Sequence, residues 1–384
     1  MKILMISTDR AMFDTDSAVS SRILEQASLV GELHIVVFTP KEEKFQKLHP
    51  TKHLTITPTR SSGKFAYLLD AYRIARAIIA DDGHVDKWLI TTQDPFETGA
   101  VGYLLSLMLS VPLHLQLHTD PWSREWKKET ILNRARFMLM LFLLRQASGV
   151  RVVSMRVEKN VIRAGVPSAK LTRAPIYTDI QHFMTAQRTF DLHASYPTYS
   201  QIVLSMGRLQ PEKNYRMLIR AFARVREKNR EAMLIIVGSG PLRDRLVSLV
   251  RTLGLGNAVV LLPWARDVAS YYRSCDVYVQ PSLYEGWGLA VVEAMASGAP
   301  VIMSDVGLAG ELLRDDETGL VVVPGDEQAL EGAIERMLGE PQLRARLGAA
   351  GREEVKKCAT KAETLMLYKI SWEHAYAQRN RKNR

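Results

Sequence analysis

Residues 280–300 read QPSLYEGWGLAVVEAMASGAP, and this stretch decides the fold class. An apolar strand ends at Gln280, a proline and a serine turn the chain, and Gly286 and Gly288 let the backbone approach a ligand closely. A helix then begins near Leu289. A strand, a loop with glycines and a helix, in this order, are typical of a parallel sheet that binds an anion at the helix N-terminus.

Two glutamates belong to the same stretch. Glu285 lies in the loop before the helix, and Glu293 lies one turn inside it. A carboxylate beside a phosphate site is repelled unless it meets hydroxyl donors, which sugars and riboses supply in pairs. Each glutamate alone has a plainer interpretation, as a solvated loop or helix charge. Together with the glycines, the pair indicates a nucleotide sugar whose two ends contact different glutamates.

A second cluster precedes this stretch in the sequence. Residues 205–214 read SMGRLQPEKN, so a strand ends at Gly207, and Arg208 and Lys213 follow it. Arginine offers a fixed fork of donors and lysine a compact point charge. The two cations at a strand end therefore suit a diphosphate whose negative charge grows as a bond to it breaks.

The rest of the chain alternates short apolar runs with stretches of helical period, which predicts an α/β fold with parallel sheets and crossover helices. In the first half we expect strands at 3–7, 33–38, 88–92, 113–117 and 150–153. In the second half we expect strands at 201–205, 233–237, 258–262, 277–280, 300–303 and 320–323. The pattern restarts at 201, so we expect two doubly wound Rossmann-like domains that face each other across a cleft.

Composition places the domain boundaries. We expect an acceptor-binding domain at 1–185, a less hydrophobic linker at 186–200 and a nucleotide-sugar-binding domain at 201–360. The segment 361–384 should form a helix that packs back onto a domain, because Trp372 and Tyr376 recur at helical spacing, and should end in a basic tail.

The overall composition excludes several classes of protein. With 384 residues, 47% of them hydrophobic and 24% charged, the chain is neither disordered nor fibrous. Cys275 and Cys358 cannot form a disulfide scaffold, and no cluster of Cys and His has zinc-ligand spacing, so we expect a reduced, cytoplasmic protein without a bound metal. The opening MKILMIST is too short for a signal peptide and is interpreted as the first strand.

The net charge of +10 is concentrated in two short segments. Residues 122–145 carry six Lys/Arg against two Asp/Glu, and the tail 379–384 carries four Lys/Arg. A charge run is either a solvated face or a contact for an anionic partner. The apolar run 137–144 is too short to span a bilayer and fits either a buried crossover helix or peripheral docking on an anionic membrane. No basic patch is interleaved with aromatic residues as in a nucleic-acid-binding module, so no nucleic acid is expected.

The chain resembles a known family. Residues 285–301 read EGWGLAVVEAMASGAPV, with seven residues between Glu285 and Glu293, and GRLQPEKN and VGSGPL precede them. These motifs are similar to those of retaining glycosyltransferases of the GT-B fold, in glycosyltransferase family 4. The resemblance implies a metal-independent hexosyltransferase that moves a sugar from a nucleotide-diphosphate donor, such as a UDP- or GDP-sugar, with retention of configuration. The acceptor would be a hydroxyl of a glycan or lipid-linked glycan in cell-envelope polysaccharide or glycolipid synthesis, reached from the inner face of the cell membrane.

The resemblance also implies roles for individual residues. The catalytic group would comprise Arg208 and Lys213 at the diphosphate, Glu285 at the sugar hydroxyls and His118 facing the donor sugar. A histidine at a strand end can equally be structural. Glu293 would bind the ribose of the nucleotide, and the nucleotide base would lie near residues 262–266. The residues assigned to donor binding are Gly207, Gly238, Gly286, Trp287, Gly288, Leu289 and Glu293.

The loop after the first strand departs from the family pattern. Members commonly carry paired glycines there, whereas residues 7–26 read STDRAMFDTDSAVSSRILEQ and contain none. Ser17, Ser20 or Ser21 would donate to a phosphate or cap a helix. Arg22 would meet a phosphate or an anionic acceptor.

The same loop contains the triplet Asp14-Thr15-Asp16, which has the form of a metal-binding DxD motif. It does not follow a nucleotide-binding strand of a single-domain transferase, so we interpret its aspartates as turn-forming residues.

Three other functions fit part of the sequence. A nucleotide-sugar epimerase or a sugar phosphorylase shares the two-domain architecture, but the first needs acid/base carboxylates at other positions and the second a phosphate site. A non-catalytic protein that keeps the nucleotide-sugar site is a second alternative, and a nucleic-acid-binding protein would account for the charge. Transfer to free phosphate, donor hydrolysis and a salt-dependent shift with random DNA separate these alternatives.

Overall fold

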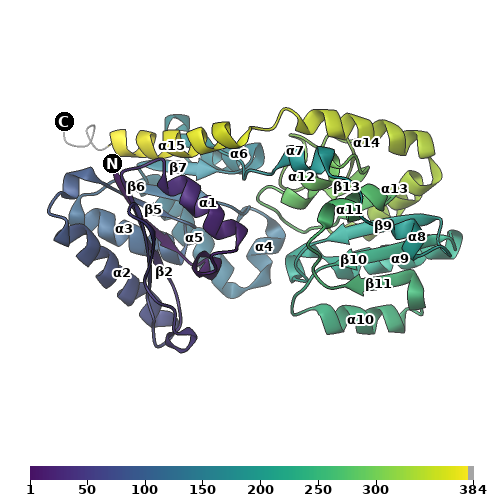
Figure 1. The fold of residues 1–384 in the computed structure, drawn as a ribbon, viewed down its shortest axis with the longest axis horizontal. Helices are drawn as coiled ribbons and strands as arrows, with labels where there is room; N and C mark the ends of the chain where they lie inside the picture. Colours follow the sequence, from purple (N-terminus) through teal and green to yellow (C-terminus); the bar gives the residue numbers. More distant parts are fainter. Residues whose placement is uncertain (379–384) are drawn as a thin grey trace. The chain divides into compact units, whose positions relative to one another are not determined.

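The structure is a computed structural model that describes residues 1–378 (Figure 1). It divides into two compact units, each with its own sheet. Unit 1 comprises Met1–Pro175 and the chain from Thr360 onward, and unit 2 comprises Ile176–Ala359. The sheets have eight and six strands and are parallel except for one pair in unit 1, so the predicted doubly wound α/β class is confirmed.

Unit 1 holds the eight-stranded sheet, in the order β3-β4-β2-β1-β5-β6-β7-β8. The order reverses beside β1, which is the feature that positions a ligand site in such sheets. The prediction missed three strands, β3, β4 and β8, two of which have only three or four residues and lie at the sheet edges. The strands are β1 Lys2–Ser7, β2 Glu32–Val37, β3 Leu48–Thr51, β4 Leu54–Pro58, β5 Trp88–Thr92, β6 Leu113–Leu117, β7 Gly149–Val152 and β8 Leu171–Arg173.

Helices cover both faces of this sheet. One face carries α1 (Ala18–Ala27) and α15 (Lys361–Ala377), which contact each other. The other carries α2 (Lys64–Asp81), α3 (Glu97–Leu109) and α5 (Ile131–Gln146), with α3 between its two neighbours. The remaining elements of unit 1 are α4 Arg124–Glu129, α6 Met155–Arg163 and the 3-10 helices η1 Arg10–Phe13, η2 Lys41–Glu43, η3 Val85–Lys87 and η4 Ser168–Lys170.

Alternation along β5 separates the two faces. Leu89 joins the core cluster that contains Trp372 of α15, whereas the next residue, Ile90, lies under Gly102 of α3. Trp372 is fully buried and Tyr368 nearly so, because α15 closes the face of the sheet that α1 covers only in part. The expected C-terminal helix therefore belongs to the core of unit 1, whereas its basic tail, 379–384, lies outside the described residues.

Unit 2 holds the six-stranded parallel sheet, in the order β11-β10-β9-β12-β13-β14. Its strands are β9 Gln201–Met206, β10 Ala232–Val237, β11 Val259–Leu262, β12 Val277–Gln280, β13 Val301–Ser304 and β14 Leu320–Val322. Its helices are α7 Ile180–Thr185, α8 Leu192–Ser195, α9 Tyr215–Lys228, α10 Arg243–Thr252, α11 Val268–Ser274, α12 Leu289–Ala296, α13 Glu327–Gly339, α14 Pro341–Val355, and the 3-10 helices η5 Pro211–Lys213 and η6 Gly256–Ala258. The central strands are buried on both faces, as the near-continuous apolar runs predict.

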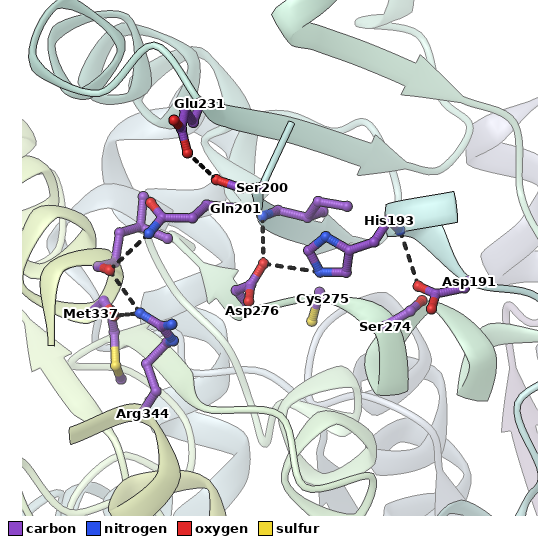
Figure 2. Close-up of polar contacts among 12 residues, drawn as sticks. Asp191, His193, Ser200, Gln201, Glu231, Ser274, Cys275, Asp276, Met337 and Arg344 are labelled. Carbon is purple, nitrogen blue, oxygen red and sulfur yellow. Dashed lines mark hydrogen bonds and ion pairs between the residues drawn. The ribbon is translucent and has the colours of Figure 1, made fainter. Parts of the chain in front are cut away.

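The boundary between the units differs from the expected one. The first unit ends at Pro175, and the expected linker 186–200 lies within unit 2 and contains α8. A polar group of this segment finds a partner there: the ring Nε2 of His193 lies 3.2 Å from the carboxylate of Asp276, as Figure 2 shows. The same carboxylate accepts a hydrogen bond from the amide of Ile202 in β9 (2.7 Å). The less hydrophobic composition of this segment thus reflects a polar surface layer of unit 2 and not an exposed tether.

No helix within residues 1–378 combines the length and the hydrophobicity that crossing a bilayer requires.

Candidate functional site

The predicted donor residues gather at the carboxyl ends of β9 and β12 in unit 2. These neighbouring strands lie where the strand order reverses, since β10 and β11 continue to one side of β9 and β13 and β14 to the other side of β12. Ligands in doubly wound sheets bind at this point. The chain after β9 supplies Arg208 and Lys213, and the chain after β12 supplies Glu285 and the start of α12.

A carboxylate held by three donors occupies the centre of this edge. Oε1 of Glu285 accepts hydrogen bonds from Lys213 Nζ (2.5 Å), Gln280 Nε2 (2.8 Å) and Ser282 Oγ (2.8 Å). The Lys213 and Glu285 side chains are each about one-seventh exposed. Within residues 1–378 no group donates to Oε2 of Glu285, so this oxygen is available to a ligand hydroxyl.

A buried tyrosine orients one of the donors to Glu285, Gln280. The buried hydroxyl of Tyr278 donates to Gln280 Oε1 (2.6 Å), which directs Gln280 Nε2 toward Ser282 and Glu285. The prediction did not include Gln280 or Ser282. Their positions directly after the strand, in the motif QPS, are the signal that identifies them.

The N-terminus of α12 carries no side-chain cap. Gly288 precedes the helix with φ of 116°, a conformation that favours glycine. The preceding loop is fixed because Trp287 is buried and its carbonyl accepts a hydrogen bond from the amide of Leu308 (2.9 Å). The first amides of α12 are therefore open to an anionic ligand.

Glu293 lies one turn further along α12 in a less polar environment. Its Oε2 accepts a hydrogen bond from the hydroxyl of Tyr272 (3.0 Å). Burial raises the pKa of the Glu293 carboxyl to about 7, and the Tyr272 hydrogen bond opposes that shift only in part. Tyr272 comes from α11, and no spacing in the sequence links it to Glu293.

The two cations do not contact a common carboxylate. Arg208 is 73% exposed and pairs with Glu212 (3.2 Å), whereas the largely buried Lys213 pairs with Glu285. The structure therefore places both residues after β9 but gives them different partners.

The glycines after β9 and β10 allow their backbones to come close together. A Cβ on Gly238 would lie 1.9 Å from the carbonyl oxygen of Gly207, so no other residue fits without a backbone shift. The amide of Gly238 also donates to the carbonyl of Leu262 at the end of β11 (3.0 Å). Trp264, in the segment where the base is expected, is more than half exposed.

His118 belongs to a buried polar network in unit 1. It follows β6, and its Nε2 lies 3.5 Å from the guanidinium of Arg151, which is fully buried and also donates to Gln116 (3.1 Å). Burial, with the charges of Arg151 and Arg22, holds the pKa of His118 well below its usual range. His118 is therefore neutral at neutral pH, and the structure brings Arg22 close enough to influence it.

The glycine-free loop after β1 uses some of its polar groups internally. Ser17 is the N-cap of α1: its Oγ accepts from the amide of Ser20 (3.0 Å) and donates to the carbonyl of Ala11 (2.6 Å), so the capping interpretation holds for Ser17. Ser20 is buried and Ser21 is exposed in the first turn of α1.

The aspartates of the same loop form a local turn, because Asp14 Oδ1 accepts a hydrogen bond from the amide of Asp16 (3.1 Å). No group of three or more His, Cys, Asp or Glu side chains in the described part of the chain is arranged to hold a metal ion.

Comparisons with known proteins agree with this architecture. The model of the family "glycosyl transferases group 1" matches residues 193–354, nearly all of unit 2. The phosphatidyl-myo-inositol mannosyltransferase of Mycobacterium leprae is 38% identical over 168 residues, which cover 43% of this chain and 44% of that protein. Alignments with four of the curated relatives span between 39% and 66% of the length of those proteins.

Two solved structures resemble the chain over nearly its whole length. Sucrose-phosphate synthase from Thermosynechococcus elongatus superposes with a TM-score of 0.78 at 25% identity, covering 98% of this chain and 99% of that one. Anabaena Alr3699/HepE in complex with UDP-glucose has a TM-score of 0.73 at 20% identity, covering 97% and 98%. The two doubly wound sheets are thus those of the GT-B fold, and unit 2 carries, over residues 193–354, the domain of the glycosyl transferases group 1 family.

Proposed function

We propose that the protein is a retaining glycosyltransferase that moves a sugar from a nucleotide-diphosphate donor to a hydroxyl acceptor. The observation that carries the proposal is the group formed by Lys213, Glu285 and the uncapped N-terminus of α12 at the reversal of the strand order. A cation and free amides suit a diphosphate, and an ionised carboxylate oxygen beside them suits a sugar hydroxyl.

The two glutamates would bind different parts of the donor. Oε2 of Glu285 would accept a hydroxyl of the transferred sugar, while Glu293 would accept the ribose hydroxyls in its ionised form. The nucleotide base would lie beside the end of β11, where Trp264 offers an exposed aromatic face. The UDP-glucose complex of the Anabaena protein, which has the same fold, supports a uridine nucleotide as the first donor to test.

The reaction breaks the bond between the anomeric carbon and the diphosphate, so negative charge grows on the leaving oxygen. Lys213, Arg208 and the amides of α12 would stabilise that charge in place of a metal ion. Retention of configuration is the outcome that the match of residues 193–354 to glycosyl transferases group 1 supports.

The acceptor would be a hydroxyl of a glycan or lipid-linked glycan bound by unit 1. The Mycobacterium leprae relative is a phosphatidyl-myo-inositol mannosyltransferase, and the lipid in its name supports the second kind of acceptor. Neutral His118, fixed by Arg151, would face the donor sugar as a hydrogen-bond partner without adding a positive charge. Arg22 would contact a phosphate of the donor or of the acceptor.

The test is a donor screen followed by product analysis. UDP- and GDP-sugars are incubated with the protein in excess EDTA, and release of the nucleoside diphosphate is measured with and without lipid-linked glycan acceptors. We expect acceptor-dependent release in EDTA and, by NMR, a product with the donor's anomeric configuration. Transfer only to free phosphate would indicate a phosphorylase, and an inverted product would refute retention.

A further inference from the structure

Three polar side chains follow one another along β6 on the face that α15 covers. His114, Gln116 and His118 alternate with leucines in the run LHLQLH, so they share one side of the sheet. His114 and Gln116 are buried, and Nε2 of His114 lies 2.7 Å from the hydroxyl of Ser371 in α15. Buried polar groups are costly unless each is hydrogen-bonded, so the partners of this row decide what its members can do.

Arg151 of β7 donates to this row. It lies opposite Gln116 in the register of the two strands and is fully buried. Its guanidinium donates to Gln116 Oε1 (3.1 Å) and to the carbonyl of Ala174 (2.6 Å), and its Nη1 lies 3.5 Å from Nε2 of His118. The guanidinium carbon also lies 4.0 Å from the ring centre of Tyr368 on α15. No carboxylate within residues 1–378 pairs with this charge, so hydrogen bonds and an aromatic face alone hold it in place.

The chemistry of the guanidinium fixes the direction of these hydrogen bonds. A guanidinium has donors and no acceptor, so Nε2 of His118 has to accept from Arg151. The single proton of the neutral His118 ring therefore lies on Nδ1. Gln116 cannot replace Arg151 as the donor, because its Nε2 already donates to the hydroxyl of Thr91 (3.3 Å) and its Oε1 faces the guanidinium.

The Nδ1–H form of His118 depends on this contact. A histidine side chain free in water holds its neutral proton mainly on Nε2, and in a protein the partner of one ring nitrogen decides which form is present. Within residues 1–378 no side chain other than Arg151 hydrogen-bonds to the His118 ring, so Arg151 selects the form. The Nδ1 atom has no partner in that part of the chain, and the His118 side chain is partly exposed, so its N–H is available to a ligand.

We propose that Arg151, held by Tyr368, is a positioning residue that keeps His118 in its Nδ1–H form, so that this N–H donates to a hydroxyl of the transferred sugar. A neutral donor suits that place, because positive charge develops on the sugar ring as its bond to the diphosphate breaks. The contact with the sugar rests on the proposed function, whereas the position of the His118 proton does not. The two statements can therefore fail separately.

Nitrogen NMR spectroscopy of the histidine side chains in the full chain locates the proton. The chain has nine histidines, and the spectrum of His118→Asn identifies the His118 signals by their absence. We expect the Nδ1–H form of His118 in the wild type. Arg151→Met keeps an apolar stem but removes the donor, so it should move His118 toward the Nε2–H form. The matched control is Arg134→Met, at an exposed arginine of α5, which should leave the His118 signals unchanged.

Turnover separates a positioning role from a structural one. The side-chain amide of His118→Asn can take the place of Nδ1, whereas that of His118→Gln reaches the place of Nε2, so His118→Asn should keep more turnover. Arg151→Met should lower turnover roughly tenfold, the effect of losing about one hydrogen bond. In the His118→Asn background the same change should have little further effect, because no proton position has to be selected there. Affinity for free UDP, which reports on unit 2, should match wild type in every variant.

A wild-type His118 with its proton on Nε2, or an unchanged His118 in Arg151→Met, would overturn the proposal. An equal loss of turnover from Arg151→Met in both backgrounds would show that Arg151 is only structural, and equal turnover of the two His118 variants would show that Nδ1–H does not donate to the sugar. If Arg151→Met does not fold, the wild-type spectrum and the two His118 variants still decide. Absence of turnover with every donor, beside an Nδ1–H form of His118, would refute the proposed function and the sugar contact but not the position of the proton.

Discussion

Lys213 and Arg208 carry the same charge in different surroundings, and this difference makes their roles testable. Lys213 is held against Glu285 at the centre of the site, whereas Arg208 is mostly exposed. Replacing Lys213 with Ala should lower turnover roughly a hundredfold, as loss of one charge-stabilising donor commonly does. Arg208→Ala should lower turnover in the same direction.

Steady-state kinetics with donor and acceptor, beside thermal unfolding, measure both variants. Lys228→Ala is the control, because this exposed lysine lies at the far end of α9. Near wild-type turnover in Lys213→Ala would mean that the Lys213–Glu285 pair is structural.

Glu293 predicts a dependence of stability on pH. Its pKa is about 7 in the folded protein, where burial disfavours the charge, and 4.5 in an unfolded chain. Between these values the folded state holds a proton that the unfolded state has lost, so the free energy of unfolding falls as pH rises. The loss amounts to at most about 3 kcal/mol between pH 4 and pH 8.

Glu293→Gln removes this term, so its stability relative to wild type should rise with pH. Urea unfolding at pH 5 and pH 8 measures the difference. Glu227→Gln, at an exposed position on α9, is the control and should shift stability equally at both pH values. A Glu293→Gln difference that is the same at both pH values would contradict the prediction.

The candidate site combines residues that the sequence predicted with residues that it did not, for a physical reason. Glu285 and Glu293 were identifiable because the glycine loop and helix between them are local in the chain. Tyr272 reaches Glu293 from another helix, so only the folded structure reveals it. Gln280 and Ser282 were within the quoted motif, but their orientation depends on the buried hydroxyl of Tyr278.

At the scale of elements, the backbone approaches closely between the ends of β9 and β10, beside the proposed donor site. In Gly238→Ala the new Cβ would lie 1.9 Å from the carbonyl oxygen of Gly207, so the backbone must move. We expect a loss of about 1–3 kcal/mol in the free energy of unfolding, together with weaker donor binding.

The matched control is Gly332→Ala, in the interior of α13, where an added Cβ meets nothing within 4 Å. This variant should gain about 0.5–1 kcal/mol and bind the donor normally. Chemical unfolding and donor titration of both variants measure the contrast. Unchanged stability and affinity in Gly238→Ala would show that the two strand ends are free to separate.

The elements themselves were predicted unevenly. Most of the buried parallel strands have continuous apolar runs, and their positions were found within a few residues. β4 is also parallel, but its buried Leu54 and Ile56 alternate with threonines, and it was missed. β3 and β8 are short edge strands whose residues are largely exposed or polar, so they lack such a run. The exposure of Leu104, Leu107 and Met108 on α3 was not predicted. The sequence shows that this helix is apolar, but it does not show which side of the helix faces water.

At the scale of the whole molecule, the chain returns to unit 1 after completing unit 2. Trp372 of α15 is fully buried against the sheet of unit 1. Trp372→Ala should therefore cost about 3–5 kcal/mol and unfold unit 1 first.

Trp372→Phe should cost much less, because no partner within residues 1–378 accepts the indole N–H of Trp372. Trp264→Ala, at an exposed position of unit 2, is the control for tryptophan loss. Denaturation followed by circular dichroism compares the three variants. A Trp372→Ala protein as stable as wild type would show that α15 is dispensable for unit 1.

The two-unit organisation was predictable because the strand–helix alternation restarts at residue 201. The boundary was not, since the segment 186–200 looks like a linker in composition, and only its contacts with Asp276 and its neighbours assign it to unit 2.

The central claim is that unit 2 binds a nucleotide sugar, with the ribose of the nucleotide at Glu293 and the transferred sugar at Glu285. Calorimetric titration of Glu285→Gln and Glu293→Gln with the free nucleoside diphosphate, beside the turnover of each variant, tests it most directly. Glu293→Gln should weaken nucleotide binding, and Glu285→Gln should leave that binding nearly intact while turnover falls sharply. Loss of nucleotide binding in Glu285→Gln with normal binding in Glu293→Gln would contradict the assignment.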